Sequence, residues 1–112
     1  MGDQPTGYVI FTPEGRLSAM STAEGRQSGS SVEERSALLS SMIAFTGTYR
    51  LESDRWITQV DVAWNPEWVG SEQTRFFAID GDVLTVHTSW RVMPNWPEKG
   101  LTRSIMRFQR CR

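Results

Sequence analysis

The sequence has few of the features that mark secreted, membrane-spanning or nucleic-acid-binding proteins. Its one cysteine, Cys111, cannot form an internal disulfide, so a disulfide-stabilised secreted scaffold is not expected. It contains no run of about 18 apolar residues, so we expect no membrane-spanning helix. The 12 Lys and Arg residues nearly balance the 13 Asp and Glu residues, whereas a nucleic-acid-binding surface needs clustered positive charge. The opening MGDQPT lacks the basic and apolar regions of a signal peptide, and we therefore expect a cytoplasmic protein.

Motifs for cofactors, metals and nucleophilic catalysis are also missing. The sequence has one histidine, His87, and no Cys or His at metal-ligand spacing. No nucleophile elbow or phosphate loop is present, and the Ser-rich stretch around Gly25 and Gly29 lacks the strand and helix that frame a nucleotide-binding loop. We therefore expect no cofactor, no metal and no catalytic residue of these kinds.

The residues that are present predict a single all-β domain over residues 1–112, a length typical of one domain. Seven segments have the β-branched and aromatic residues of strands and are bounded by turn residues, with no alternation of strands and helices. The predicted strands are 8–12, 16–21, 48–51, 56–64, 75–79, 82–88 and 101–109.

One helix interrupts this pattern, over about residues 32–45. Ser31 and Glu34 have the spacing of a capping box, and Leu38, Met42 and Phe45 form an apolar stripe at helical spacing. We expect this stripe to pack against a sheet or over the end of a barrel.

The lengths of the connections predict an antiparallel up-and-down β-barrel. If consecutive strands are neighbours, the tight turns at 13–15, 53–54 and 80–81 lie at one end, and the long connections 22–46, 65–74 and 89–100 lie at the other. The long loops form a mouth, and loops on a rigid scaffold often carry binding residues. Seven strands leave the first and last parallel, so we expect an incomplete barrel whose open seam is covered by a second copy of the chain, in a dimer or higher homo-oligomer.

Four segments resemble the bacterial and fungal lipocalin-like domain family, and the likeness runs from about Gly7 to Phe108. The Pro-x-Trp-Val-Gly and Asp-Gly-Asp elements at their relative spacing are its most specific part. The resemblance implies a small antiparallel barrel around a cavity for a small, largely apolar molecule, and no single catalytic activity. The four segments are 7–19, 43–49, 66–73 and 75–85.

The sequence departs from the family pattern at two points. Family members usually begin with a further strand carrying a Gly-Thr-Trp motif, which we expect to be the eighth strand missing here. The family often has a His-x-Glu pair before the Pro-x-Trp loop, and this sequence has Gln59 and Asp61 at those positions. Chemistry that depends on that histidine is therefore not expected.

The hairpin 75–88 predicts a buried arginine. A two-residue Asp80-Gly81 loop of type I′ places the more apolar face, which includes Arg75, toward the interior and His87 on the outside. A buried guanidinium requires a partner. The expected pairs are Ile79 with Asp82, Phe77 with Leu84, and Arg75 with Val86.

The strand 56–64 has two possible orientations. The apolar pattern alone turns Trp56, Val60, Val62 and Trp64 inward, whereas the family resemblance turns Gln59 and Asp61 toward the cavity. We expect the second orientation, with Asp61 paired to Arg75. Such a pair either orients a ligand or only fixes the strand register.

The mouth loops are rich in tryptophan, with Trp64, Trp68, Trp90 and Trp96 in or beside two of them. These side chains either line a ligand entrance, anchor a partner chain or fill the end of the barrel.

The leading functional hypothesis is non-catalytic binding of a small, largely apolar or aromatic molecule in the barrel cavity. One alternative is a cofactor-free isomerase or cyclase that acts on a hydrophobic metabolite, with Asp61 or Tyr49 transferring the proton. The other is an oligomeric interaction module without a ligand. The expected ligand-binding residues are Tyr49, Gln59, Asp61, Trp68, Arg75 and Phe77.

Overall fold

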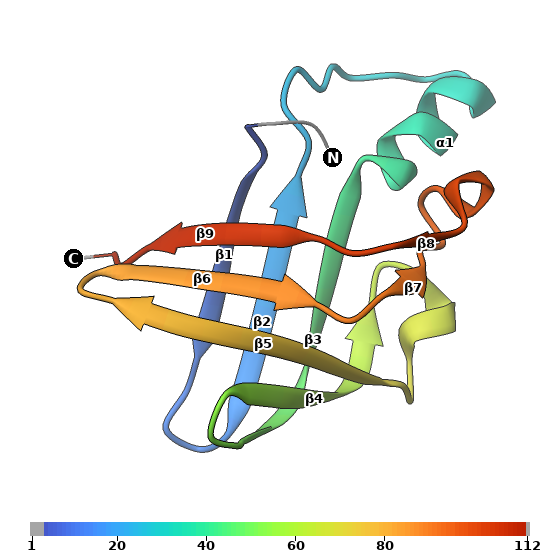
Figure 1. Cartoon of the computed structure of the whole chain (residues 1–112). Coiled ribbons are helices and arrows are strands. Elements are labelled where there is room, and N and C mark those ends of the chain that lie inside the picture. The colour runs from blue at the N-terminus through green and yellow to red at the C-terminus, as the bar shows by residue number, and fades with distance from the viewer. Residues whose placement is uncertain (1–3, 112) are drawn as a thin grey trace.

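A seven-stranded antiparallel sheet curls almost into a barrel, and one helix lies outside it (Figure 1). The computed structural model describes residues 4–111. The elements are β1 (Thr6–Phe11), β2 (Arg16–Thr22), α1 (Val32–Ser40), β3 (Met42–Leu51), β4 (Arg55–Ala63), the 3₁₀ turn η1 (Pro66–Trp68), β5 (Glu72–Asp80), β6 (Val83–Thr88), β7 (Arg91–Val92), the 3₁₀ turn η2 (Pro97–Lys99), β8 (Leu101–Thr102) and β9 (Ile105–Gln109).

The strand order confirms the predicted up-and-down topology. The order is β1-β2-β3-β4-β5-β6-β9, so each strand of the main sheet pairs with its neighbours along the chain. In Figure 1, β5, β6 and β9 pass in front of β1–β3 at a steep angle, as expected of a strongly coiled sheet. Val9 of β1 and Phe108 of β9 pack against the same core cluster, so the two ends of the sheet face one interior. The barrel is nearly closed, and β1 and β9 form its two edges.

The hairpin between β5 and β6 has a register that differs from the prediction. Asp80 pairs with Val83, so the two-residue loop is Gly81-Asp82 rather than Asp80-Gly81. Gly81 has a φ of 59°, and every residue with a positive φ in the described chain is a glycine. A turn with glycine at the first central position needs only that one positive φ, whereas a type I′ turn at Asp80-Gly81 would need two. The register shift is two residues, so the predicted faces are unchanged.

The interior face of this hairpin is as predicted around Arg75, whereas Ile79, which was also expected to face inward, is exposed near the turn. Arg75, Val86 and Thr88 are buried, and Phe77 pairs with Val86. His87 lies on the other face, where its ring stacks on Phe76 at a centroid distance of 5.0 Å.

The helix begins as predicted and ends five residues early. Ser31 Oγ accepts a hydrogen bond from the Glu34 backbone N–H, and the Glu34 carboxylate accepts one from the Ser31 N–H, both at 3.0 Å. The predicted end at Phe45 is wrong, because α1 stops at Ser40 and β3 begins at Met42. Ile43 and Phe45 instead alternate along β3 into the core. No residue of α1 is buried, so the expected apolar helix face is absent.

The last predicted strand, 101–109, is two strands. Leu101–Thr102 pairs with β7 in a small separate ladder, and Ile105–Gln109 pairs with β6. The ladder to β6 begins where the Thr88 N–H donates to the Ser104 carbonyl at 3.0 Å and Thr88 Oγ1 accepts from the Ser104 N–H at 2.9 Å. Residues 89–104 therefore form an excursion from the sheet, which we call the β6–β9 excursion.

The β6–β9 excursion is fastened at its middle. Met93 is fully buried in the core cluster. Asn95 Nδ2 donates to the carbonyls of Ser40 and Met42, at 3.0 and 2.8 Å, and so ties the excursion to the junction of α1 and β3.

A β-bulge changes the register between β3 and β4. Thr46 pairs with Val62 and Gly47 pairs with Val60, so Asp61 is an extra residue on β4. A Cβ at Gly47 would lie 2.0 Å from the Gln59 carbonyl oxygen, which makes glycine necessary at this close approach. The bulge turns both Asp61 and Val62 outward, and both are exposed.

In the described residues no helix has the length and apolar character needed to cross a membrane.

The buried apolar residues of the core cluster are Leu17, Phe45, Trp56, Val60, Trp68, Val86 and Met93.

Candidate ligand-binding cavity

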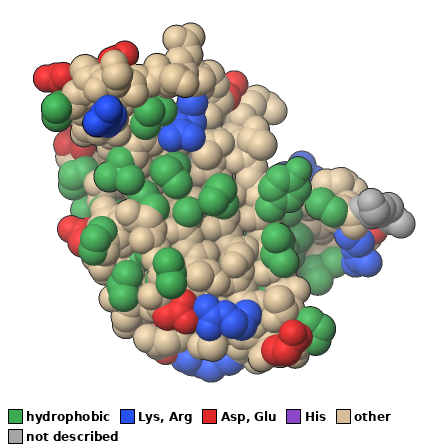
Figure 2. Space-filling model, turned by 180° about the vertical axis from the view of Figure 1, so that it is seen from behind, with side chains coloured by type: hydrophobic (Ala, Val, Ile, Leu, Met, Phe, Trp, Pro, Cys, Tyr) green, Lys and Arg blue, Asp and Glu red, His purple; other side chains and the backbone are tan. Residues whose placement is uncertain are grey.

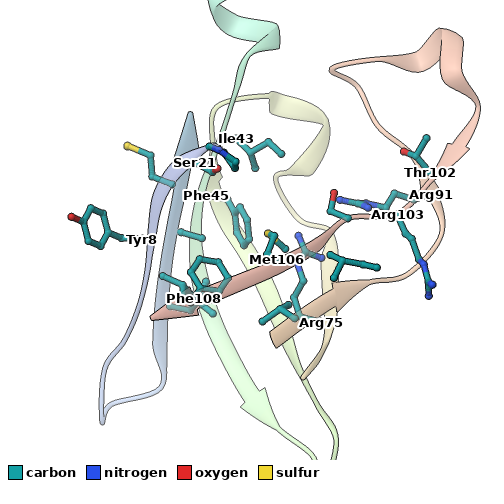
Figure 3. A pocket seen from close by; sticks show the side chains of 18 of the residues that line it. Tyr8, Ser21, Ile43, Phe45, Arg75, Arg91, Thr102, Arg103, Met106 and Phe108 are labelled. Carbon is teal, nitrogen blue, oxygen red and sulfur yellow. The ribbon is translucent and has the colours of Figure 1, made fainter. Parts of the chain in front are cut away.

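A cavity of about 380 Å³ lies between the two ends of the sheet. Side chains from β1, β2 and β3 form one wall and side chains from β9 and β6 form another, as Figure 3 shows. The volume is at the small end of the range of about 300–1,000 Å³ for small-molecule sites. Its apolar lining is Val9, Leu17, Ala19, Ile43, Phe45, Trp56, Val86, Trp96, Ile105, Met106 and Phe108, with Pro5, Tyr8 and Met20 at the edge formed by β1 and β2.

The charged groups in the lining all have one sign. Four cationic side chains contribute to the cavity, and in the described part of the chain no Asp or Glu does so. Figure 3 shows Arg75 directed toward the centre of the cavity near Phe45 and Met106, with Arg91 and Arg103 on the side of the β6–β9 excursion. The four cations are Arg75, Arg91, Lys99 and Arg103.

Arg75 is buried without a carboxylate. Its side chain is 7% exposed, and its Nη1 donates one hydrogen bond, at 3.1 Å, to the carbonyl of Thr74. Among the described residues no carboxylate forms an ion pair with it. Burial, and then the nearby charge of Arg91, lowers the pKa of Arg75 to about 9. The guanidinium is still charged at neutral pH, so the fold holds a cation that the protein itself does not neutralise.

Two aromatic rings lie near the Arg75 guanidinium. Its central carbon lies 5.7 Å from the ring centroids of both Phe45 and Trp68. These two rings contact each other edge-to-face at 5.2 Å. The ring faces offer partial compensation for the buried charge, because the aromatic quadrupole attracts cations.

Arg91 adds a second cation beside Arg75. Its Nη1 donates to Thr88 Oγ1, while its Nε is buried and has no hydrogen-bond partner. Burial lowers the pKa of Arg91 as well. Because Arg91 belongs to the short strand β7, the β6–β9 excursion is what brings it to the cavity.

A smaller, more polar pocket of about 260 Å³ adjoins the first. Arg75 and Arg91 line both spaces and therefore stand at the boundary between them. Glu72 lines this second pocket, but its carboxylate accepts a hydrogen bond at 3.0 Å from Arg50 on the neighbouring surface. The remaining lining is Trp68, Gln73, Thr74, Ser89 and Val92.

The predicted orientation of Gln59 and Asp61 is wrong. Both are exposed on the outer face of β4. Asp61 pairs with Arg16 at 2.9 Å and not with Arg75, and Gln59 Nε2 donates to the Gly70 carbonyl at 3.1 Å. The inward positions are taken by Trp56 and Val60, as the apolar alternation alone favours.

The other predicted site residues are distributed around the cavity. Arg75 lines it, and Trp68 lines the second pocket. Phe77 packs in the core with its ring 5.5 Å from that of Trp56. Tyr49 donates its hydroxyl to the Thr12 carbonyl at 3.2 Å and is outside the lining. Neither Tyr49 nor Asp61 is therefore placed for proton transfer inside the cavity.

Arg91 and most of the apolar wall were not predicted from the sequence. Residues such as Met106 and Phe108 alternate with exposed residues along β9, so strand periodicity predicts their face once the strand start at Ile105 is known. Arg91 lies in a long loop, where no periodicity predicts the direction of a side chain.

The tryptophans have separate roles. Trp56 and Trp96 line the cavity, and Trp96 Nε1 donates to Thr102 Oγ1 at 3.0 Å. Trp64 and Trp68 pack edge-to-face at 4.9 Å at the mouth end. Trp90 is exposed and lies against the guanidinium of Arg103 at 5.0 Å.

An up-and-down antiparallel barrel with an internal apolar cavity defines the class of small lipocalin-type barrels. The comparisons give the family. The profile of the family described as lipocalin-like domain matches residues 1–111, and the chain belongs to this family. A search of curated proteins found no match. Membership suggests ligand binding in general. The described residues contain no group of three or more His, Cys, Asp and Glu side chains arranged to hold a metal ion.

Proposed function

We propose that the protein binds a small, largely apolar or aromatic molecule in the 380 Å³ cavity, without catalysing a reaction. The observation that carries this proposal is the cavity lining, which is mostly apolar and includes the buried cation Arg75. Binding sites for small molecules commonly combine an apolar wall with a few polar groups that fix orientation. Arg75 is the polar group that holds one end of the ligand.

The aromatic part of the lining favours a flat or flexible apolar ligand. Phe45, Trp56 and Trp96 present ring surface to the cavity, and Met106 adds a flexible side chain that adapts to ligand shape. These side chains come from four different segments of the chain, so the cavity depends on the whole fold.

Titration with the neutral apolar fluorophore N-phenyl-1-naphthylamine tests this proposal. We expect a saturable, one-to-one rise in its fluorescence, because the dye leaves water for the cavity. Ala19→Leu fills part of the cavity and is expected to weaken binding. Ala78→Leu, on the exposed face of β5, adds the same atoms outside it and is the matched control. Absence of saturable binding to the wild-type protein would overturn the proposal.

We also propose that a second copy of the chain covers the open seam. Tyr8 and Ile10 on β1 and Ile105 on β9 are all more than half exposed, although these edge strands have unpaired backbone groups that proteins usually protect. Figure 2 shows hydrophobic side chains in a band across the back of the molecule, over the outer face of β1–β4. The strand register places four apolar residues of this region on the outer face, and each is more than half exposed: Tyr8, Ile10, Met20 and Val62.

Sedimentation velocity at micromolar concentration tests the association. We expect a dimer or higher oligomer that Ile10→Lys converts to monomer, because a charge on the edge strand opposes its burial. Val32→Lys on α1, at an apolar position that is more exposed than Ile10, serves as the control. A wild-type protein that sediments as a monomer contradicts the seam proposal and leaves the cavity proposal intact.

A further inference from the structure

We propose that the ligand is an amphipathic carboxylate, with its head group bound between Arg75 and Arg91 and its apolar part in the cavity. This inference rests on the proposed function, because it specifies the chemistry of the molecule bound there. Three observations support it: unused donors on the buried Arg75 and the partly buried Arg91, the absence in the described residues of a carboxylate that neutralises them, and the position of both arginines where the apolar cavity meets the polar pocket.

The first observation concerns hydrogen bonds. A guanidinium has five N–H donors and no acceptor. Arg75 uses its side chain for one hydrogen bond, to the carbonyl of Thr74, and the buried Nε of Arg91 has none. Buried donors without partners are costly in a folded protein. A carboxylate has two oxygens with about four acceptor positions, and it matches the planar fork of a guanidinium.

The second observation concerns charge. The buried Arg75 and the partly buried Arg91 carry like charges beside the same cavity. Burial, and then the charge of Arg91, lowers the pKa of Arg75. The carboxylate of Glu72 is engaged by Arg50 on the outer side. In the described chain, no acidic side chain lines the 380 Å³ cavity. A neutral polar ligand would satisfy the donors but leave the charge, so an anion is the better match.

The third observation concerns position. Arg75 and Arg91 stand where the apolar cavity meets the smaller polar pocket. From there the apolar lining continues through Phe45 and Met106 toward Phe108. A free inorganic anion would leave that wall unused, whereas an amphipathic carboxylate contacts both the arginines and the wall.

A matched pair of probes tests the proposal. Dodecanoate and dodecan-1-ol have the same chain and differ in the charge of the head group. Each is titrated at neutral pH against the protein loaded with N-phenyl-1-naphthylamine, and its affinity is taken from displacement of the dye. We expect dodecanoate to bind at least about tenfold more tightly than the alcohol, the order of magnitude of a charge-assisted hydrogen-bonded contact.

Substitutions locate the preference. Arg75→Met and Arg91→Met are each expected to remove most of the preference for dodecanoate over dodecan-1-ol, because each variant removes a positive charge that only the carboxylate can pair with. Arg107→Met removes the same charge from β9, where this residue is exposed between Met106 and Phe108, and is expected to keep the preference. Arg91 is only partly buried, so this variant keeps the test available if Arg75→Met fails to fold.

The outcomes separate the two proposals. Equal affinity of the wild-type protein for the acid and the alcohol would overturn the carboxylate inference and leave apolar binding in place. A preference for the acid that survives in both Arg75→Met and Arg91→Met would also overturn it. Binding of neither probe, nor of the dye, would overturn the proposed function itself.

Discussion

Trp56 lies directly opposite Arg75 across the β4–β5 ladder, and both side chains face the cavity. The register places a fluorescent indole beside the cation that we propose as the binding group. The same strand pair therefore provides the site and a spectroscopic reporter of its occupancy.

The first prediction concerns that reporter. Trp56→Phe is expected to reduce the change in intrinsic fluorescence that dodecanoate produces, because it removes the cavity-lining indole that lies opposite Arg75 across the β4–β5 ladder. Trp90→Phe, at an exposed position outside the cavity lining, is expected to retain the change. Equal responses in the two variants would place the ligand away from the β4–β5 ladder.

The second prediction concerns the stability of the protein without ligand. Arg75→Met is expected to raise the free energy of unfolding at neutral pH by about 1–4 kcal/mol, because it replaces a buried, unneutralised cation with an apolar side chain. The pKa of Arg75 is lowered in the folded protein to about 9. The destabilising effect of its charge is therefore present below this pH and decreases above it, and the advantage of the variant should shrink there. Urea unfolding of the wild-type protein and of Arg75→Met, at neutral pH and near pH 10, measures the difference in their free energies of unfolding.

The third prediction concerns the pH dependence of binding. The affinity for dodecanoate is expected to be constant around neutral pH and to fall above about pH 9, as Arg75 loses its proton. The other charged groups that face this region are Arg91 from β7, Lys99 from η2, Arg103 before β9 and Glu72 of β5. Dodecan-1-ol carries no charge and should show no such fall, and Arg75→Met should abolish it for dodecanoate. Displacement titrations across this pH range give the profile.

The fourth prediction concerns the bulge. Gly47→Ala is expected to lower the free energy of unfolding by at least about 2 kcal/mol, because the added Cβ would meet the Gln59 carbonyl oxygen at 2.0 Å. Thr48→Ala, at the adjacent exposed position on β3, is a control for loss of strand propensity. Thermal unfolding followed by circular dichroism distinguishes the two, and similar midpoints would contradict the close approach.

The fifth prediction concerns Asp61. Asp61→Asn is expected to leave the affinity for dodecanoate unchanged and to alter the free energy of unfolding by less than about 1 kcal/mol, because its pair with Arg16 is exposed. A large loss of affinity for dodecanoate would contradict this prediction and show that Asp61 takes part in binding. Displacement titration and urea unfolding of this variant provide the measurement.

Much of the fold followed from local patterns in the sequence. The alternation of tight turns with long connections was enough to predict the up-and-down order, and strand parity predicted that Arg75 and Val86 face inward even though the turn was misplaced by one residue. Side chains alternate between the two faces of a strand, so a register shift of two residues leaves each of them on its predicted face. The helix start at Val32 followed from the capping box of Ser31 and Glu34.

The errors lie where tertiary contacts override local patterns. The apolar residues near Phe45 have helical spacing, but they form part of strand β3, from which Ile43 and Phe45 pack into the core. The bulge at Gly47 adds a residue on β4, and the close backbone approach that it requires has no sequence motif of its own. Arg91 reaches the cavity from a loop. The single domain, the cytoplasmic location and the absence of a cofactor stay predictions.

The two edge strands also set the energetics of ligand exchange. β1 and β9 are the ends of the sheet order, so moving them apart breaks no hydrogen bond between them, and the cavity is lined from both sides of this gap. Only side-chain contacts across the gap, such as those of Val9 and Phe108 with the core cluster, must be lost for the cavity to widen. A single copy of the chain could therefore admit a ligand through this gap without separating hydrogen-bonded strands, and a second copy seated over the seam would close that route.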